Sequence, residues 1–179
     1  MAINKKMEEA INKEINAELF SAYLYLSMAS WFEDRDLLGF TNWMKCQYME
    51  ETMHGMKFYN FLNERSGRAI LTAIDSPKTE WKTPLDVFED VYAHEQKVTA
   101  LIDGMVTLAK ELKDYASESL LMWFVDEQVE EESSAHQIIS RLKLIGDNAS
   151  ALLMLDQELK ARAVSPMAVP TILGQPTGA

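Results

Sequence analysis

Apolar side chains recur along this chain at alternating spacings of three and four residues, the period of a helix that buries one face. In the first stretch the repeat runs through Ile11, Ile15, Ala22, Tyr25 and Ala29. Polar turns divide the repeat, which predicts helices over residues 4–33, 37–65, 84–110, 115–145 and 148–162. The chain is therefore expected to be all-α.

Residues 66–83 interrupt this pattern. They contain Gly67 and Pro77 and lack a sustained helical period, so we expect a connection. Connections above about 12 residues are unusual, but a bundle that returns to its starting end before the third helix needs one. Thr83 followed by Pro84 is typical of a helix start. The predicted fold is a four-helix bundle with a long crossover between helices 2 and 3, plus a short fifth C-terminal helix.

Length and composition suit one domain, because 179 residues that are 47% apolar can bury a sizeable core. We expect it to span residues 1–163, with residues 164–179 as an extended or disordered tail. The single cysteine, Cys46, allows neither an internal disulfide nor a Cys-x-x-Cys metal clip, which favours a reducing compartment.

The net charge of -11 repels nucleic acid and anionic membranes and attracts cations, although solubility alone explains it equally well. No apolar run approaches the ~18 residues that span a bilayer. Residues 1–14 alternate charged and apolar groups, unlike a signal peptide. We therefore expect a cytoplasmic protein with no nucleic-acid or membrane partner.

Six polar side chains occupy positions where the helical repeat calls for core residues: Glu18, Glu51, His54, Glu95, Gln128 and Glu131. In an antiparallel hairpin, two residues lie at the same height when their numbers are symmetric about the turn. Glu18 and Glu51 are centred between residues 34 and 35. Glu95 with Gln128, and Glu95 with Glu131, are centred within residues 111–113, in the turn between the third and fourth predicted helices. Each predicted hairpin therefore brings its polar groups together.

Four of these six groups are carboxylates, and a buried ion costs on the order of several kcal/mol. No Lys or Arg shares the stripe near this layer, so protons or bound cations must neutralise it. Two divalent ions would balance four negative charges. Glu51 and His54, at i and i+3, present a carboxylate and an imidazole on one helix face, which favours metal. The alternative is a protonated, hydrogen-bonded core layer.

At these positions the sequence resembles the ferritins, most closely the bacterial non-haem type, over about residues 4–163. The resemblance rests on Glu18 and on three segments at the separations found in that family: Glu50-Glu51-x-x-His54, His94-Glu95-Gln96-x-Val98-Thr99 and Glu127-Gln128-Val129-Glu130-Glu131. Ferritin-like bundles are the standard example of di-iron sites built from carboxylates on facing helices. The resemblance therefore implies a two-iron ferroxidase centre.

The resemblance implies a first iron bound by Glu18, Glu51 and His54. It implies a second iron bound by Glu95 and Glu131, with Glu51 as the bridge.

Other residues are implied to lie around this pair. Gln128 is implied to lie near the first iron, and Tyr25 to lie beside the centre, where a core aromatic with a bonded hydroxyl is the alternative. Glu50, Glu127 and Glu130 resemble the third iron site of bacterial ferritins, just outside the pair. The alternative for these three is a solvated helix face.

Haem is not expected. In bacterioferritin, the haem-binding relative, the ligating methionine would fall at position 52, which is Thr52 here, and Met53 is turned by ~100° around the helix. The fourth helix of that relative has Glu-x-x-His where this chain has Gln128-x-x-Glu131.

The resemblance implies an iron storage protein with ferroxidase activity, which oxidises Fe(II) with dioxygen or peroxide. The ferric mineral would be kept in a closed homo-oligomer of roughly 24 subunits. Two other classes stay open: a di-iron enzyme that reduces peroxide or oxygenates a small substrate, and an iron-free structural bundle. A rubrerythrin-like enzyme would normally add a Cys-rich iron module, which Cys46 alone cannot make.

Overall fold

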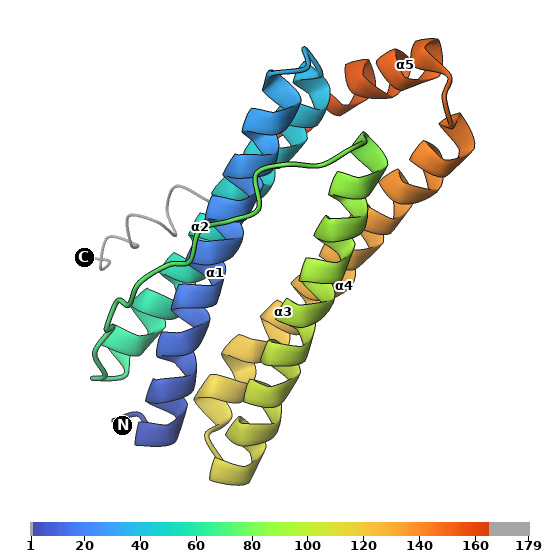
Figure 1. The fold of residues 1–179 in the computed structure, drawn as a ribbon. Helices are drawn as coiled ribbons and strands as arrows, with labels where there is room; N and C mark the ends of the chain where they lie inside the picture. The colour runs from blue at the N-terminus through green and yellow to red at the C-terminus, as the bar shows by residue number, and fades with distance from the viewer. Residues whose placement is uncertain (1, 165–179) are drawn as a thin grey trace, which may run out of the picture. The chain divides into compact units, whose positions relative to one another are not determined.

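The computed structural model describes residues 2–164, so nearly all of the expected tail lies outside the described residues. The described part contains the helices α1 (Lys5–Glu33), α2 (Leu38–Glu64), α3 (Pro84–Leu112), α4 (Tyr115–Ile145) and α5 (Ala149–Leu159) (Figure 1). The all-α prediction is confirmed, with most helix ends within a few residues of those expected. None of the described helices combines the length and apolar character needed to cross a membrane.

These helices belong to two compact units. The first contains residues 2–3, 11–80 and 149–164, and therefore most of α1 together with α2 and α5. The second contains residues 4–10 and 81–148, and therefore the first turns of α1 together with α3 and α4. The polar residues of the predicted layer are divided between the two units.

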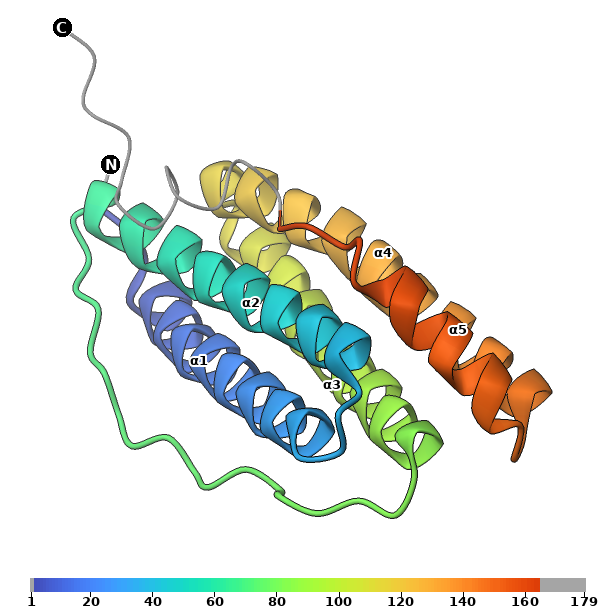
Figure 2. The same cartoon turned by 90° about the horizontal axis from the view of Figure 1, so that it is seen from above.

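The connection between α2 and α3 runs along the outside of α1 (Figure 2). Three α1 side chains, Asn12, Asn16 and Ser27, hold it by hydrogen bonds of 2.6–3.4 Å. Their partners, in chain order, are Arg68 and Ile70, then Thr72 and Ala73, then Lys78. The connection therefore returns towards the end of α1 at which α2 begins, as the predicted crossover requires.

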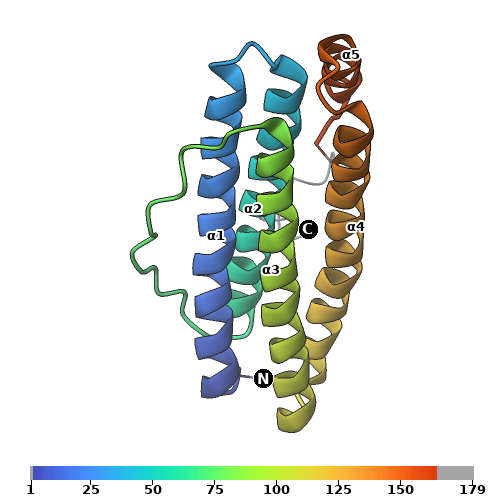
Figure 3. The same ribbon diagram turned by 45° about the vertical axis from the view of Figure 1, so that its right-hand side comes forward.

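Most of the second unit is an antiparallel pair, α3 and α4, joined by a tight turn (Figure 3). Thr83 caps the start of α3 with a capping box. The Thr83 hydroxyl accepts a hydrogen bond from the Asp86 backbone N–H, and the Asp86 carboxylate accepts one from the Thr83 backbone N–H. Lys113 ends α3 in the left-handed conformation, with φ of 53°. The next residue, Asp114, caps α4 by accepting from the Ser117 backbone N–H.

The short helix α5 packs on the first turns of α2. The buried Asp156 accepts hydrogen bonds at Oδ1 from the backbone N–H groups of Gly39 (2.6 Å) and Phe40 (3.1 Å), which the start of a helix leaves without intrahelical partners. At Gly39 the approach is so close that an added Cβ would lie 1.6 Å from the Asp156 carbonyl oxygen. Glycine is therefore required at this contact.

The predicted end of the fifth helix at residue 162 is wrong, because α5 ends at Leu159. Asn42 of α2 donates from Nδ2 to the carbonyl oxygens of Leu159, Lys160 and Arg162, at 3.2, 3.4 and 2.9 Å. This side chain satisfies carbonyls that a continuing helix would have paired internally. The helix ends where its contact with α2 supplies these hydrogen bonds.

Candidate metal centre

Three predicted ligands converge in the first unit. Glu18 from α1 and Glu51 and His54 from α2 each offer a ligand atom, and these atoms lie within 4.8 Å of one another. His54 Nδ1 lies 3.4 Å from Glu51 Oε2 and 4.0 Å from Glu18 Oε2. All three residues are at most 2% exposed. The hairpin symmetry and the i, i+3 spacing therefore predicted a real cluster.

Local packing brings α1 close enough to α2 to form this cluster. Gly55 follows His54, and a Cβ added there would lie 3.4 Å from Glu18 Cβ, in direct contact. This is an ordinary van der Waals distance, so the α2 backbone at Gly55 lies close to Glu18 of α1. Two carboxylates with one imidazole form a donor set that suits a divalent transition metal such as iron. The residues present therefore fit the implied first iron.

One carboxylate near this cluster was not predicted as a site residue. Glu14 lies one turn before Glu18 on α1 and is only 2% exposed. Its Oε1 atom is buried and has no hydrogen-bond partner. Burial, and to a smaller extent the negative charge of Glu51, raise the pKa of the Glu14 carboxyl to about 8. Its position four residues before Glu18, on the apolar stripe, was the signal that could have revealed it.

Replacing Glu14 by Gln should remove a pH-dependent loss of stability. Below the usual pKa of 4.5 both the folded and the unfolded chain hold the proton. Between about pH 4.5 and 8 only the folded chain keeps it, so the stability of the parent falls across this window and levels off above it. An amide does not titrate, so the variant should gain on the order of a few kcal/mol over the parent by pH 8.

Thermal unfolding of the iron-free protein between pH 5 and 9 checks this expectation. The matched control is Glu9→Gln, which removes a carboxyl from an exposed position of the same helix. A difference between Glu14→Gln and the parent that stays constant with pH would show that Glu14 is ionised in the folded chain.

The second unit brings together Glu95 of α3 and Gln128 of α4, both buried. Gln128 Nε2 donates to Glu95 Oε2 at 3.2 Å and to the Glu95 carbonyl oxygen at 3.3 Å. The pairing confirms the height match about the second turn. Glu131, 7% exposed, lies one turn further along α4. Its place beside an iron shared with Glu51 stays a prediction.

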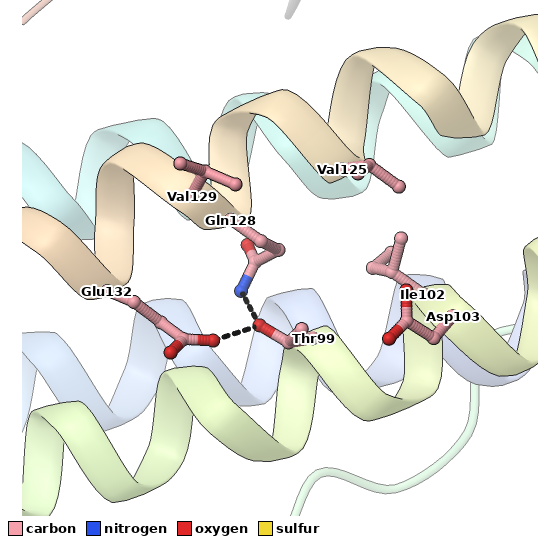
Figure 4. Close-up of a pocket in the computed structure, with 7 residues that line it drawn as sticks. All are labelled: Thr99, Ile102, Asp103, Val125, Gln128, Val129 and Glu132. Carbon is pink, nitrogen blue, oxygen red and sulfur yellow. Dashed lines mark hydrogen bonds between the residues drawn. The ribbon is translucent and has the colours of Figure 1, made fainter.

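Two further polar residues extend this group. Thr99 Oγ1 accepts from Gln128 Nε2 at 3.3 Å and donates to Glu132 Oε1 at 2.6 Å (Figure 4). These residues line a half-open cavity of about 280 Å³, whose other walls are Ile102, Asp103, Val125 and Val129. Thr99 and Glu132 each lie four residues after a predicted site residue, which was the available signal. The chain of hydrogen bonds fixes the Gln128 amide and, through it, the Glu95 carboxylate.

The remaining predicted residues have mixed surroundings. Tyr25 is fully buried in the first unit, with its ring edge-on to Trp43 at 6.4 Å between centroids, which suits a core aromatic. Glu50 is also in the first unit and pairs with Arg162 at 2.6 Å. Glu127 is half-buried and Glu130 is exposed, both on α4 of the second unit. The redox role of Tyr25 and the grouping of the three glutamates stay predictions.

Comparisons with known proteins agree with the expected resemblance. A family model described as the ferritin-like domain matches residues 8–145. A bacterial non-heme ferritin of Staphylococcus saprophyticus is 42% identical over 161 residues, which cover 90% of this chain and 96% of the relative. One from Bacteroides fragilis is 41% identical over 160 residues, which cover 89% of this chain and 99% of the relative.

Solved structures show the same fold. A crystal structure of an open-pore ferritin from Archaeoglobus fulgidus superposes with a TM-score of 0.89 and 52% sequence identity. The match covers 90% of this chain and 98% of that one. The fold class, four bundle helices and a short fifth helix, is thereby confirmed.

Proposed function

This chain belongs to the ferritin family, and we propose that it oxidises Fe(II) at a buried pair of sites and stores the ferric product inside a closed homo-oligomer. Iron is the substrate and the cargo. The observation that carries the proposal is the buried cluster of Glu18, Glu51 and His54, whose two carboxylates and imidazole suit Fe(II). Stored iron also agrees with the names of the relatives, which are bacterial non-heme ferritins.

The first iron would be held by Glu18, Glu51 and His54, and the second by Glu51, Glu95 and Glu131. Two Fe(II) ions give up one electron each, which is enough to reduce one dioxygen to hydrogen peroxide when water supplies two protons. The imidazole and carboxylates hold the two ions together, so both electrons are available to one oxidant. The donor sets also differ, because the second has only oxygen ligands.

The difference between the two donor sets favours release of iron to a mineral over its retention at the site. A site with oxygen ligands alone should bind iron less tightly than a site that includes an imidazole. In the second unit, Gln128 donates one hydrogen bond to the Glu95 carboxylate, which orients that ligand while drawing electron density from it. The second iron is therefore the one that leaves for the mineral most readily. Glu50, Glu127 and Glu130 would receive iron next, as a third site.

Storage further requires enclosure, so we propose a closed cage of roughly 24 subunits, by family likeness and because most homo-oligomers have closed symmetry. The expected cytoplasmic location belongs to the same proposal. Large exposed apolar side chains such as Leu71, Val129 and Leu144 lie on the surface of the single chain, where neighbouring subunits could cover them.

Aerobic addition of Fe(II), followed by absorbance and iron analysis, tests the proposal. A storage protein should take up many more irons per subunit than the two or three that its sites bind, and light scattering should show a large assembly. A plateau at two or three irons would indicate an oxygenating or peroxide-reducing enzyme, and no oxidation would indicate a structural bundle.

Replacing Glu50, Glu127 and Glu130 together by Ala should spare the first oxidation but alter later turnovers.

A further inference from the structure

Arg162 follows the end of α5 and contacts one face of α2 through both its backbone and its side chain. Its carbonyl oxygen accepts from Asn42 Nδ2 at 2.9 Å and from Cys46 Sγ at 3.7 Å. Its guanidinium lies 4.4 Å from the Trp43 ring centroid, and Nη1 donates to the Trp43 carbonyl oxygen at 3.3 Å. The remaining contact, from Nη2 to Glu50 Oε2, is the shortest at 2.6 Å.

This contact is a partly shielded ion pair. The side chains of Arg162 and Glu50 are 23% and 15% exposed, so water screens their attraction less than it does for a surface pair. Stacking over Trp43 also holds the guanidinium in place, since Arg prefers the face of an indole ring. The Glu50 carboxylate is therefore already neutralised by a cation that the protein itself supplies.

We propose that Arg162 competes with metal ions for the Glu50 carboxylate, so that a metal ion binding there displaces the guanidinium and loosens residues 160–164, which follow α5. The inference rests on the proposed role of Glu50 as an iron ligand. The guanidinium is bonded to Oε2, so a divalent cation that binds Oε2, alone or together with Oε1, would lie close enough to the guanidinium for the two cations to repel each other. Arg162 is thus a positioning residue that sets how tightly Glu50 binds iron and when it releases it.

Cys46 gives a readout of the displacement that does not depend on oxidation. Its side chain is 4% exposed and its thiol donates to the Arg162 carbonyl, so the docked segment covers it. Burial raises the pKa of the Cys46 thiol, which further slows its reaction with thiol reagents. Release of Arg162 should therefore uncover a thiol whose labelling rate is easily measured.

The first test measures binding of Tb³⁺, a redox-inert ion that prefers carboxylate oxygens, to the assembled iron-free protein. Parent, Arg162→Met, Glu50→Gln and the double variant form a cycle. Arg162→Met keeps an apolar stem against Trp43 but removes the competing charge, so the weakest class of Tb³⁺ sites should bind about tenfold more tightly, the scale of one charge-assisted hydrogen bond. In the Glu50→Gln background the same change should have no effect.

The matched control is Lys45→Met. It removes one positive charge from α2, the helix that carries Glu50, at an exposed ion pair with Glu33. It should leave the affinity of the weakest class unchanged. If Arg162→Met and Lys45→Met have equal effects, the gain comes from net charge and the inference is overturned. Unchanged affinity in Arg162→Met overturns it as well, even where Glu50→Gln weakens binding and so supports the third iron site.

The deciding measurement of the second test uses the unmodified protein and so does not depend on how a variant folds. Saturating Tb³⁺ should increase the rate of Cys46 labelling by Ellman's reagent several-fold. In Glu50→Gln, where Arg162 has already lost its carboxylate, the metal should cause no further increase. Labelling that Tb³⁺ does not change in the parent overturns the inference. Iron loading of the same parent remains a separate measure of the proposed function.

Discussion

Replacing His54 by Ala should slow the rapid phase of Fe(II) oxidation on the order of 100-fold, since loss of even an outer partner of a metal ligand costs roughly 10–100-fold. His54 supplies the only imidazole in the buried cluster of described residues, at 3.4 Å from the Glu51 carboxylate that is proposed to bridge the irons. Without it the first site has only oxygen ligands, so the iron pair is rarely complete and dioxygen meets single ions. Stopped-flow absorbance at two Fe(II) per subunit measures the rate.

The matched control is His136→Ala, which removes an exposed imidazole of α4 that lies beside the Tyr92 ring. That variant should keep the parent rate. Glu18→Ala should behave like His54→Ala, because it removes a carboxylate from the same cluster. Rates equal to the parent in both cluster variants would refute a di-iron reaction at this site, whatever the fate of iron storage.

Replacing Gly39 by Ala should lower stability by about 4 kcal/mol and reduce the apparent Tm by roughly 10 °C. The new Cβ would lie 1.6 Å from the Asp156 carbonyl oxygen, a backbone atom that cannot move without moving α5. Undocking would break two hydrogen bonds to the buried Asp156 carboxylate and expose Leu155 and Leu159. Thermal unfolding followed by circular dichroism measures the loss, and Cys46 labelling reports whether α5 has left α2.

Gly104→Ala is the control for this prediction. Gly104 lies within α3, and a Cβ added there meets nothing within 4 Å. Alanine should therefore stabilise the helix, by up to about 1 kcal/mol. Opposite signs for the two substitutions would confirm that contact with Asp156, rather than glycine itself, sets the cost. A Gly39→Ala variant as stable as the parent would show that α5 contributes little to the folded chain.

The helices and each half of the candidate site could be predicted because they depend on short-range regularities. Spacings of three and four placed Glu18 and Glu51 on buried stripes, and symmetry about a turn placed them at one height. The same symmetry paired Glu95 with Gln128. A hairpin with a short turn leaves little freedom in how its two helices align, so numbering alone was informative.

Contacts of α5 could not be predicted in this way. Asp156 and Gly39 are separated by 117 positions, and Arg162 and Glu50 by 112, with no turn whose symmetry relates them. Sequence shows an acidic residue on a short helix and a glycine near a helix start, each with many ordinary explanations. Only the docked backbone reveals that one caps the other, and that an iron-site candidate such as Glu50 already has a partner.

Within residues 2–164, the connection along α1 is the segment most suited to local opening. The side-chain amides of Asn12 and Asn16, rather than a ladder of backbone hydrogen bonds, hold it against α1. The side chains of Leu71 and Ile74 in this connection are exposed. Segments with few buried contacts open at far lower free energy than packed helices, so proteases and hydrogen exchange reach them first. The connection also ends close to the boundary between the two compact units, at residues 80 and 81. A single nick there would interrupt the chain while leaving α3 and α4 joined, and α1 still linked to α2.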